Sequence, residues 1–235
     1  MRTKLFGTAL ALALVAAVPV AGQYGHDARG DNGMRLFAGV YEPKGDSSYW
    51  HDSFIDFTGQ AADFEDGTVG IEYSRELAGN LRLLAGGSFF EGRTDQAYRD
   101  FVDNRGDDIT HRTTVTLGTA TLGLAVNLAP RRAPVVPYIG AGVGLYSWEL
   151  EERGDFIDFG PGSSLEIFRS TYRDDGVTPG WFWLAGLEIP LSSDFAIFAQ
   201  GRWHHAEDDL EGDFTDLGKI DLSGRELAAG LTWRF

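Results

Sequence analysis

Eight segments of the chain alternate between apolar residues and small, polar or charged residues. In the last segment, one set of alternate positions is apolar throughout, and it holds Leu227, Ala229, Leu231, Trp233 and Phe235. Successive side chains of a β-strand point to opposite faces, so this period of two predicts strands. The eight predicted strands are residues 34–41, 68–77, 81–90, 113–128, 136–150, 181–191, 195–205 and 225–235.

The connections between these segments alternate between short and long. The short ones are residues 78–80, 130–134 and 192–194, and the long ones are 42–67, 91–112, 151–179 and 208–224. No helical period of 3.6 is sustained along the chain. This layout predicts an all-β fold, an eight-stranded antiparallel up-and-down transmembrane β-barrel with its short turns at one rim and its long loops at the other.

The face opposite the aliphatic residues carries charges of both signs, at Glu72, Arg82, Glu188, Arg202, Glu226 and Arg234. A membrane barrel turns its apolar face outward to lipid and its polar face inward. Because eight strands enclose only enough space for side chains, we expect these charges to form an ion-pair network in a plugged, polar lumen. The alternative is a soluble β-sandwich whose charged face is solvated.

Aromatic residues gather at the segment ends. Trp181, Trp183 and Trp203 adjoin long loops, whereas Tyr73, Phe195, Trp233 and Phe235 adjoin short turns. Two aromatic girdles at the two membrane interfaces would give this distribution. Any one of these rings could instead belong to an ordinary core.

The N-terminus resembles an export signal. Arg2 and Lys4 precede an apolar run from Leu5 to Val20, and small residues follow it. The run is short for a retained transmembrane helix, which is the alternative. We therefore expect a signal peptide over residues 1–22 and one barrel domain over residues 23–235.

Composition excludes several classes of function. The chain has 20 basic and 35 acidic residues, a net charge of −15, which argues against a nucleic-acid partner because a phosphate-binding surface must be basic. It has no cysteine, so thiolate chemistry and cysteine metal sites are excluded.

The run from Pro137 to Gly144, the final strand with its aromatic end and the eight-segment layout resemble the small outer-membrane β-barrels of Gram-negative bacteria, the OmpA-, OmpX- and OmpW-like transmembrane domains. The resemblance covers nearly the whole chain after the signal and implies location in the bacterial outer membrane. It also implies that the barrel-assembly machinery reads the last strand, at the matching positions Gly230, Leu231, Trp233 and Phe235. Unlike OmpA itself, the chain shows no peptidoglycan-binding domain after the barrel, so no peptidoglycan anchor is implied.

The sharpest catalytic candidate is residues 202–207, at the outer end of a predicted strand. This stretch resembles the lipid A deacylase family in placing a histidine near a strand end. That family has a serine nucleophile two residues after the histidine, whereas Ala206 and Glu207 follow His204 and His205 at that spacing. Without the hydroxyl, we expect no enzyme activity.

Metal and cofactor sites are not predicted either. His204 and His205 are adjacent, so in a regular strand they point to opposite faces and cannot chelate one ion together. Acidic pairs occur in the long stretches, but no calcium-loop motif is present. Weak divalent bridging between these loops and lipopolysaccharide phosphates stays a hypothesis.

These observations favour a monomeric barrel with a structural, membrane-integrity or surface-interaction role. Its expected partners are outer-membrane lipids, lipopolysaccharide and the barrel-assembly machinery. Two alternatives stay open: a narrow OmpW-like pore for small solutes, and a lipid A-modifying hydrolase.

Overall fold

The computed structural model describes residues 31–131, 133–160 and 166–235, so the expected signal peptide at residues 1–22 lies outside the described residues. Most of the described chain is β-strand. Its strands are β1 (Asn32–Pro43), β2 (Asp66–Ala78), β3 (Leu81–Val102), β4 (Asp108–Asn127), β5 (Val136–Asp158), β6 (Glu166–Pro190), β7 (Phe195–His205), β8 (Glu207–Asp209), β9 (Lys219–Asp221) and β10 (Gly224–Arg234). The short helices are α1 (Ser48–Asp56), η1 (Ala61–Phe64) and η2 (Gly212–Leu217).

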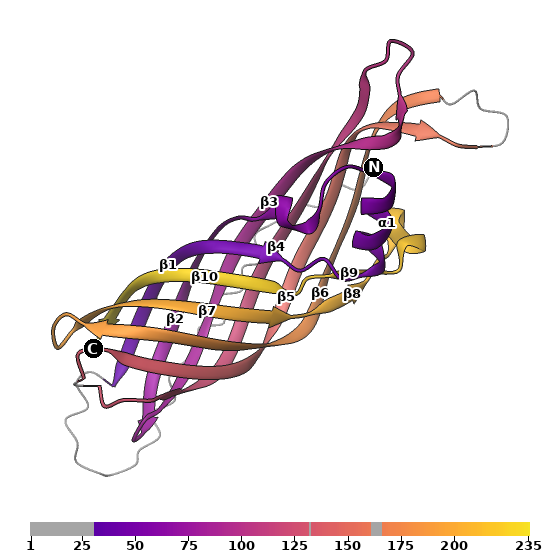
Figure 1. Ribbon diagram of the computed structural model, residues 1–235. Helices are drawn as coiled ribbons and strands as arrows, with labels where there is room; N and C mark the ends of the chain where they lie inside the picture. Colours follow the sequence, from indigo (N-terminus) through magenta and orange to yellow (C-terminus); the bar gives the residue numbers. More distant parts are fainter. Residues whose placement is uncertain (1–30, 132, 161–165) are drawn as a thin grey trace.

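Eight of these strands close into an antiparallel barrel, which confirms the predicted fold class (Figure 1). The order around the barrel is β1-β10-β7-β6-β5-β4-β3-β2, and β8 pairs with β9 in a separate two-stranded sheet. The register of β1 against β10 runs from Gly33 opposite Arg234 to Pro43 opposite Gly224, so the first and last strands complete the ring. Closure leaves no sheet edge in the barrel wall, as a membrane barrel requires. In the described parts of the chain, no helix has the length and apolar character needed to cross a membrane.

Four strands extend far beyond their predicted ends. Residues 91–112 and 151–179 were expected to be loops, but β3 continues to Val102, β4 begins at Asp108, β5 continues to Asp158 and β6 begins at Glu166. That prediction was wrong because the apolar residues change face along these strands. In these stretches the outward positions are polar, whereas the outward positions nearer the short turns are apolar. The strand period itself continues without interruption.

Strand β5 shows this reversal of polarity most clearly. Its first half points Ile139 and Val143 outward, and these residues are 52 % and 62 % exposed. Its second half points Tyr146, Trp148 and Leu150 inward, with at most 3 % exposed. The same strand therefore presents an apolar outer face at one end and an apolar inner face at the other.

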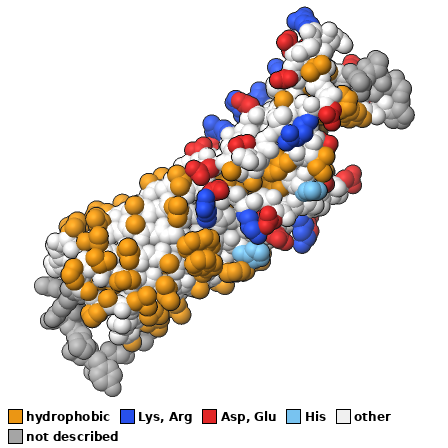
Figure 2. Space-filling model, viewed as in Figure 1, with side chains coloured by type: hydrophobic (Ala, Val, Ile, Leu, Met, Phe, Trp, Pro, Cys, Tyr) orange, Lys and Arg blue, Asp and Glu red, His pale blue; other side chains and the backbone are white. Residues whose placement is uncertain are grey.

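The lower half of the barrel carries an apolar outer surface, which we call the wall. Figure 2 shows hydrophobic side chains concentrated over this half. On β4 the wall includes Leu122, Leu124 and Val126, each between 42 % and 50 % exposed. Residues 118–128 cover roughly 33 Å along a strand, and a tilt of about 40° reduces this to about 25 Å, the thickness of an outer-membrane apolar band. We call the end where β2–β3, β4–β5 and β6–β7 connect the turn end.

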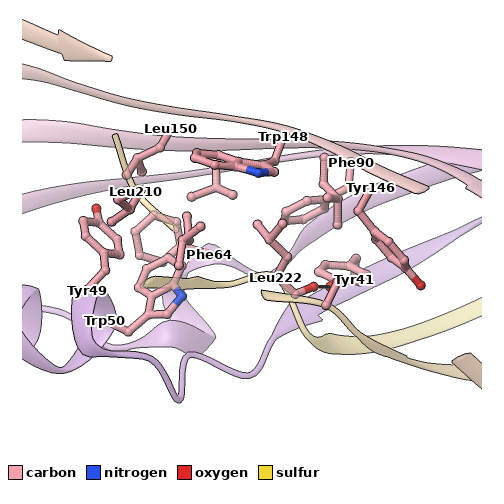
Figure 3. Close-up of a cluster of buried hydrophobic side chains, with 14 of the residues drawn as sticks. Tyr41, Tyr49, Trp50, Phe64, Phe90, Tyr146, Trp148, Leu150, Leu210 and Leu222 are labelled. Carbon is pink, nitrogen blue, oxygen red and sulfur yellow. Dashed lines mark hydrogen bonds between the residues drawn. The ribbon is translucent and has the colours of Figure 1, made fainter. Parts of the chain in front are cut away.

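The opposite end is a folded unit, which we call the head. It consists of the extensions of β3 to β6 together with α1, η1, η2, β8 and β9. Trp50 from α1, Phe64 from η1 and Phe214 from η2 are at most 3 % exposed and belong to one apolar cluster with residues of the strand extensions. Figure 3 shows Trp50 and Phe64 in this cluster with Trp148 and Leu150 of β5. Residues 42–67 and 208–224 were expected to be irregular loops, and their helices form because this apolar cluster gives them a surface to bury.

Candidate functional site

The barrel interior holds the charges that the sequence singled out. The side chains of Glu72, Arg82, Glu188, Arg202, Glu226 and Arg234 all point inward, and each residue is at most 8 % exposed. The solvated face of a soluble sandwich is therefore excluded. Burying charge is costly unless each ion has a partner, so the arrangement of these groups determines what the interior can do.

Glu72 lies between two arginines. Its Oε1 accepts a hydrogen bond from Arg35 Nη1 at 2.6 Å, and its Oε2 accepts one from Arg202 Nη2 at 2.5 Å. The guanidinium of Arg35 also lies 3.7 Å from the centre of the Phe198 ring, and that of Arg202 lies 4.7 Å from the Phe182 ring. One carboxylate and two aromatic faces thus compensate two buried cations.

Glu188 makes the second such cluster, closer to the turn end. It accepts hydrogen bonds from Arg82 Nη1 at 3.1 Å and from Arg234 Nη2. Arg82 also donates to the side chain of Asn127, and its Nε lies 3.3 Å from Glu76 Oε1. Two carboxylates and an amide therefore surround Arg82.

Tyr138 connects the two clusters. Its hydroxyl accepts a hydrogen bond from Arg35 Nη2 at 2.6 Å and donates one to Gln200 Oε1 at 3.1 Å. Its ring lies between Arg35 and Arg82, whose guanidinium carbons are 5.3 and 5.2 Å from the ring centre. Gly186 leaves the space for this ring, because a Cβ there would lie 2.5 Å from the Tyr138 hydroxyl.

Glu226 departs from the expected network. It lies opposite Arg202 in the register of β10 and β7, but Arg202 bonds Glu72 instead. Within the described residues Glu226 makes no ion pair, and its Oε2 accepts a hydrogen bond of 3.3 Å from Thr68 Oγ1. Its Oε1 is buried with no partner among the described residues.

Among the described residues, Arg35 is the one interior arginine that the sequence pattern did not single out. It is fully buried, and it shares the inward face of β1 with Phe37 and Tyr41, which are 6 % and 3 % exposed. The sequence contained an indication of this position, because Arg35, Phe37 and Tyr41 fall on the same set of alternate positions and therefore share one face of the strand. Aromatic rings were expected on the outer face, so the pattern of this strand was ambiguous.

The residues proposed for the aromatic girdles lie near the two ends of the wall. Trp183 and Trp203 are opposite one another on β6 and β7, and their rings stack with centroids 3.7 Å apart. Trp181 is 50 % exposed and its ring packs against that of His205, with centroids 5.2 Å apart, although β6 continues well past it into the head. At the turn end, Phe195 is 44 % exposed and Tyr73 donates a hydrogen bond to Asn32.

The positions of the expected assembly signal lie on β10 and just past its end. Leu231, Trp233 and Phe235 point outward and are 43 %, 52 % and 46 % exposed. Gly230 lies where β10 approaches β1 closely, since a Cβ there would be 2.0 Å from the Leu36 carbonyl oxygen. The described structure thus presents three outward apolar side chains at the C-terminal strand.

The two adjacent histidines point to opposite faces of β7. His204 is 4 % exposed inside the barrel, and its Nδ1 lies 3.0 Å from the Tyr146 hydroxyl. His205 faces outward, with its Nδ1 3.2 Å from Ser223 Oγ. A serine thus approaches this histidine from another part of the chain, but Ser223 is 3 % exposed and accepts the amide N–H of Ala206, so its hydroxyl serves the backbone.

No group of three or more metal-ligating side chains comes together in the portions of the chain that the structure describes. Several acidic residues of the head pair with arginines or accept hydrogen bonds from backbone amides instead. Asp95 accepts two hydrogen bonds from Arg112, and Asp174 accepts one from the amide of Glu211.

Burial shifts the pKa of two ionisable groups inside the head. Glu152 is 7 % exposed, and burial raises its pKa, although the Tyr49 hydroxyl donates to it at 2.7 Å. His111 is 2 % exposed between Phe57, Tyr98 and Phe156, and burial lowers its pKa to about 4. Neither ring nitrogen of His111 has a partner within the described structure.

Comparison with solved structures finds small outer-membrane barrels. Neisserial surface protein A has 13 % sequence identity and a TM-score of 0.51, with 87 % of this chain and 96 % of that chain covered. OprG from Pseudomonas aeruginosa has 14 % identity and a TM-score of 0.55, with 90 % and 98 % covered. These likenesses show the fold. Comparison with curated protein sequences finds no match.

The family model described as the outer membrane protein beta-barrel domain matches residues 8–235, which is almost the whole chain. The match agrees with the closed eight-stranded ring, the apolar wall and the charged interior. The chain therefore belongs to the outer-membrane β-barrel protein family and is a protein of the bacterial outer membrane.

Proposed function

We propose that the chain is a non-conducting barrel that holds a rigid head at the cell surface for surface interaction, and that it is neither a pore nor an enzyme. The observation that carries this proposal is the filling of the interior by two successive layers. The first layer consists of the two arginine–carboxylate clusters around Glu72 and Glu188. The second consists of the aromatic core of the head.

An ion that crossed the barrel would have to displace both layers. Opening the first layer would leave buried charges without partners, at a cost of about 3–5 kcal/mol for each broken pair. Opening the second would expose a core that includes Tyr41, Tyr146 and Trp148. A pocket of about 10 Å³ lies at the turn end beside Arg82 and Glu188, which is room for roughly one water molecule.

The proposed orientation places the head outside the cell and the turn end in the periplasm. It follows the family pattern of short periplasmic turns and longer extracellular segments. Its partners would be outer-membrane lipids and lipopolysaccharide around the wall, with the barrel-assembly machinery reading the last strand. We propose a monomer, because the wall is apolar all round and suits lipid on every side.

Planar-bilayer recording of the purified full chain tests the closed interior. We expect no unitary current steps above the membrane leak for the wild type. Arg35→Ala, which removes an ion-pair partner of Glu72, should produce transient openings, whereas Arg112→Ala, which removes an exposed pair, should not. Regular steps from the wild type would contradict the proposal and favour the narrow pore.

The orientation has its own test, because the chain contains no cysteine. Arg105→Cys places a single thiol in the exposed turn between β3 and β4. On intact cells, a membrane-impermeant maleimide should label this thiol fully, and Ser193→Cys in the β6–β7 turn should be labelled only after lysis. The reverse pattern would invert the barrel.

A further inference from the structure

The outer surface of the head contains a groove that the function above does not use. It has a volume of about 600 Å³ and lies across the outward face of β3, β4, β5 and β6. Its lining includes four arginines, four acidic residues and three threonines. These are Arg93, Arg112, Arg153, Arg169, Glu91, Asp95, Glu149, Glu151, Thr110, Thr114 and Thr116.

The chemistry of the lining restricts the ligand. The groove contains no aliphatic side chain, and its one aromatic ring, that of His111, is only 2 % exposed, so it offers little to an acyl chain or an apolar peptide. It is lined by guanidinium, carboxylate and hydroxyl groups in alternation, with equal numbers of positive and negative side chains. Such a surface suits a ligand with many hydroxyl groups and a few anionic groups, such as a phosphorylated saccharide.

The position of the groove identifies where such a ligand comes from. Glu91 is the next outward residue after Phe89, a wall residue that is 49 % exposed. On β5, Glu149 follows the outward Leu145 and Ser147. The groove thus begins where the wall ends, and a lipid whose chains lay on the wall would place its head group in the groove.

One arginine of the groove is available to an anion. Arg93 pairs with Glu91, Arg112 with Asp95 through two hydrogen bonds of 2.7 and 3.0 Å, and Arg169 with Asp155. Arg153 lies between Arg112 on β4 and Thr171 on β6 in the sheet register. In the described structure it has neither a hydrogen bond nor an ion pair, and its side chain is exposed.

We propose that this groove binds the phosphorylated core saccharide of a lipopolysaccharide molecule in the outer leaflet, with Arg153 donating to a core phosphate and Thr114 and Thr116 bonding sugar hydroxyls. The inference rests on the proposed orientation, which puts the head on the lipopolysaccharide side. It assigns the contact to the outer face of the sheet, and not to the acidic loops that the sequence suggested.

The test compares lipopolysaccharide binding by the purified full-length chain and two variants. Arg153→Gln removes the proposed phosphate contact, and Arg105→Gln removes an exposed arginine of the same head outside the groove. Binding is titrated with three probes: lipopolysaccharide with a phosphorylated core, the same core without phosphate, and lipid A alone. Native mass spectrometry counts the molecules retained by each barrel.

The wild type and Arg105→Gln should bind the phosphorylated core at least about fivefold more tightly than the other two probes, a difference expected for one exposed charge-assisted contact. Arg153→Gln should lose this preference and keep its affinity for lipid A. Thr114→Val should weaken binding of both core-bearing probes equally, because its hydroxyl meets a sugar.

Equal binding of all three probes by the wild type would overturn the proposal, as would an unchanged preference in Arg153→Gln. Heat-dependent electrophoretic mobility verifies that each variant is folded. Lipopolysaccharide binding is measured separately from conductance and from maleimide labelling. A result that contradicts the proposed groove can therefore be distinguished from one that contradicts the closed interior or the orientation.

Discussion

Four strands, β3 to β6, run through both the wall and the head, and the two regions obey opposite rules of polarity. Around the wall, apolar side chains face outward and arginine–carboxylate clusters face inward. In the head, aromatic side chains face inward and charged residues such as Arg112 and Glu149 face outward. The change occurs within single strands and leaves their period of two intact. The environment outside the strand, lipid or water, therefore decides which face is apolar.

An ion pair should contribute more to the free energy of unfolding in the barrel interior than on the surface of the head. In the interior, Glu72→Gln leaves Arg35 and Arg202 without their shared carboxylate, so we expect a loss of about 3–5 kcal/mol in the free energy of unfolding. In the head, Glu149→Gln removes one partner of the half-exposed Arg173 and should cost less than about 1 kcal/mol. Urea unfolding in lipid vesicles measures both. Similar losses in the two variants would break the comparison.

A charge placed on the outer face tests where lipid ends. Leu124→Arg puts a guanidinium on the wall and should destabilise the barrel by about 2–4 kcal/mol. Thr114→Arg, ten residues earlier on the same face of β4, should change stability by less than about 0.5 kcal/mol because water solvates it. Unfolding in the same vesicles provides the two values, and equal effects would show that the boundary lies elsewhere.

The head should loosen in acid while the wall does not. His111 is neutral when folded, because burial lowers its pKa to about 4 from the ordinary 6.5. The contribution of His111 to the stability of the head is therefore fully present above pH 6.5. It decreases as the pH falls from 6.5 towards 4, because in this range the imidazole is protonated only when the head is open. The maximum loss is about 3 kcal/mol.

Hydrogen exchange of the β3–β4 hairpin, corrected for intrinsic rates, measures this local opening between pH 7 and pH 4. His111→Phe keeps an aromatic ring among Phe57, Tyr98 and Phe156 but cannot titrate. Its hairpin should show a weaker pH dependence than the wild type. An identical pH profile in both proteins would assign the opening to other groups.

Sequence reasoning succeeded where lipid imposes one simple pattern. Strand β7 was predicted with its observed ends, Phe195 and His205, because β7 belongs to the wall and does not extend into the head. It failed on residues 91–112 and 151–179, where the apolar positions change face and the outward residues become charged. Tyr146, Trp148 and Leu150 already alternated with polar residues, so the extension of β5 was visible in principle.

The interior was predictable only in part. The alternation of side chains along the strands predicted that Glu72, Arg82 and Glu188 point into the barrel, but it could not predict which of the charged groups form ion pairs. Arg35 pairs with Glu72 across β1 and β2, whereas Arg202 reaches the same carboxylate from the far side of the barrel. Such contacts depend on the stagger of the strands, which no local pattern encodes.

The sequence by itself determined the number of barrel strands, their alternation and the face on which the interior charges lie. These follow from the period of two and from the apolar residues that a strand must present to lipid. Only the tertiary structure decided that the long connections fold into a head and, among the described residues, that Glu226 makes no ion pair and that Arg153 lies without a partner in an outer groove. Each of these depends on residues distant in the sequence, brought together when the ring closes.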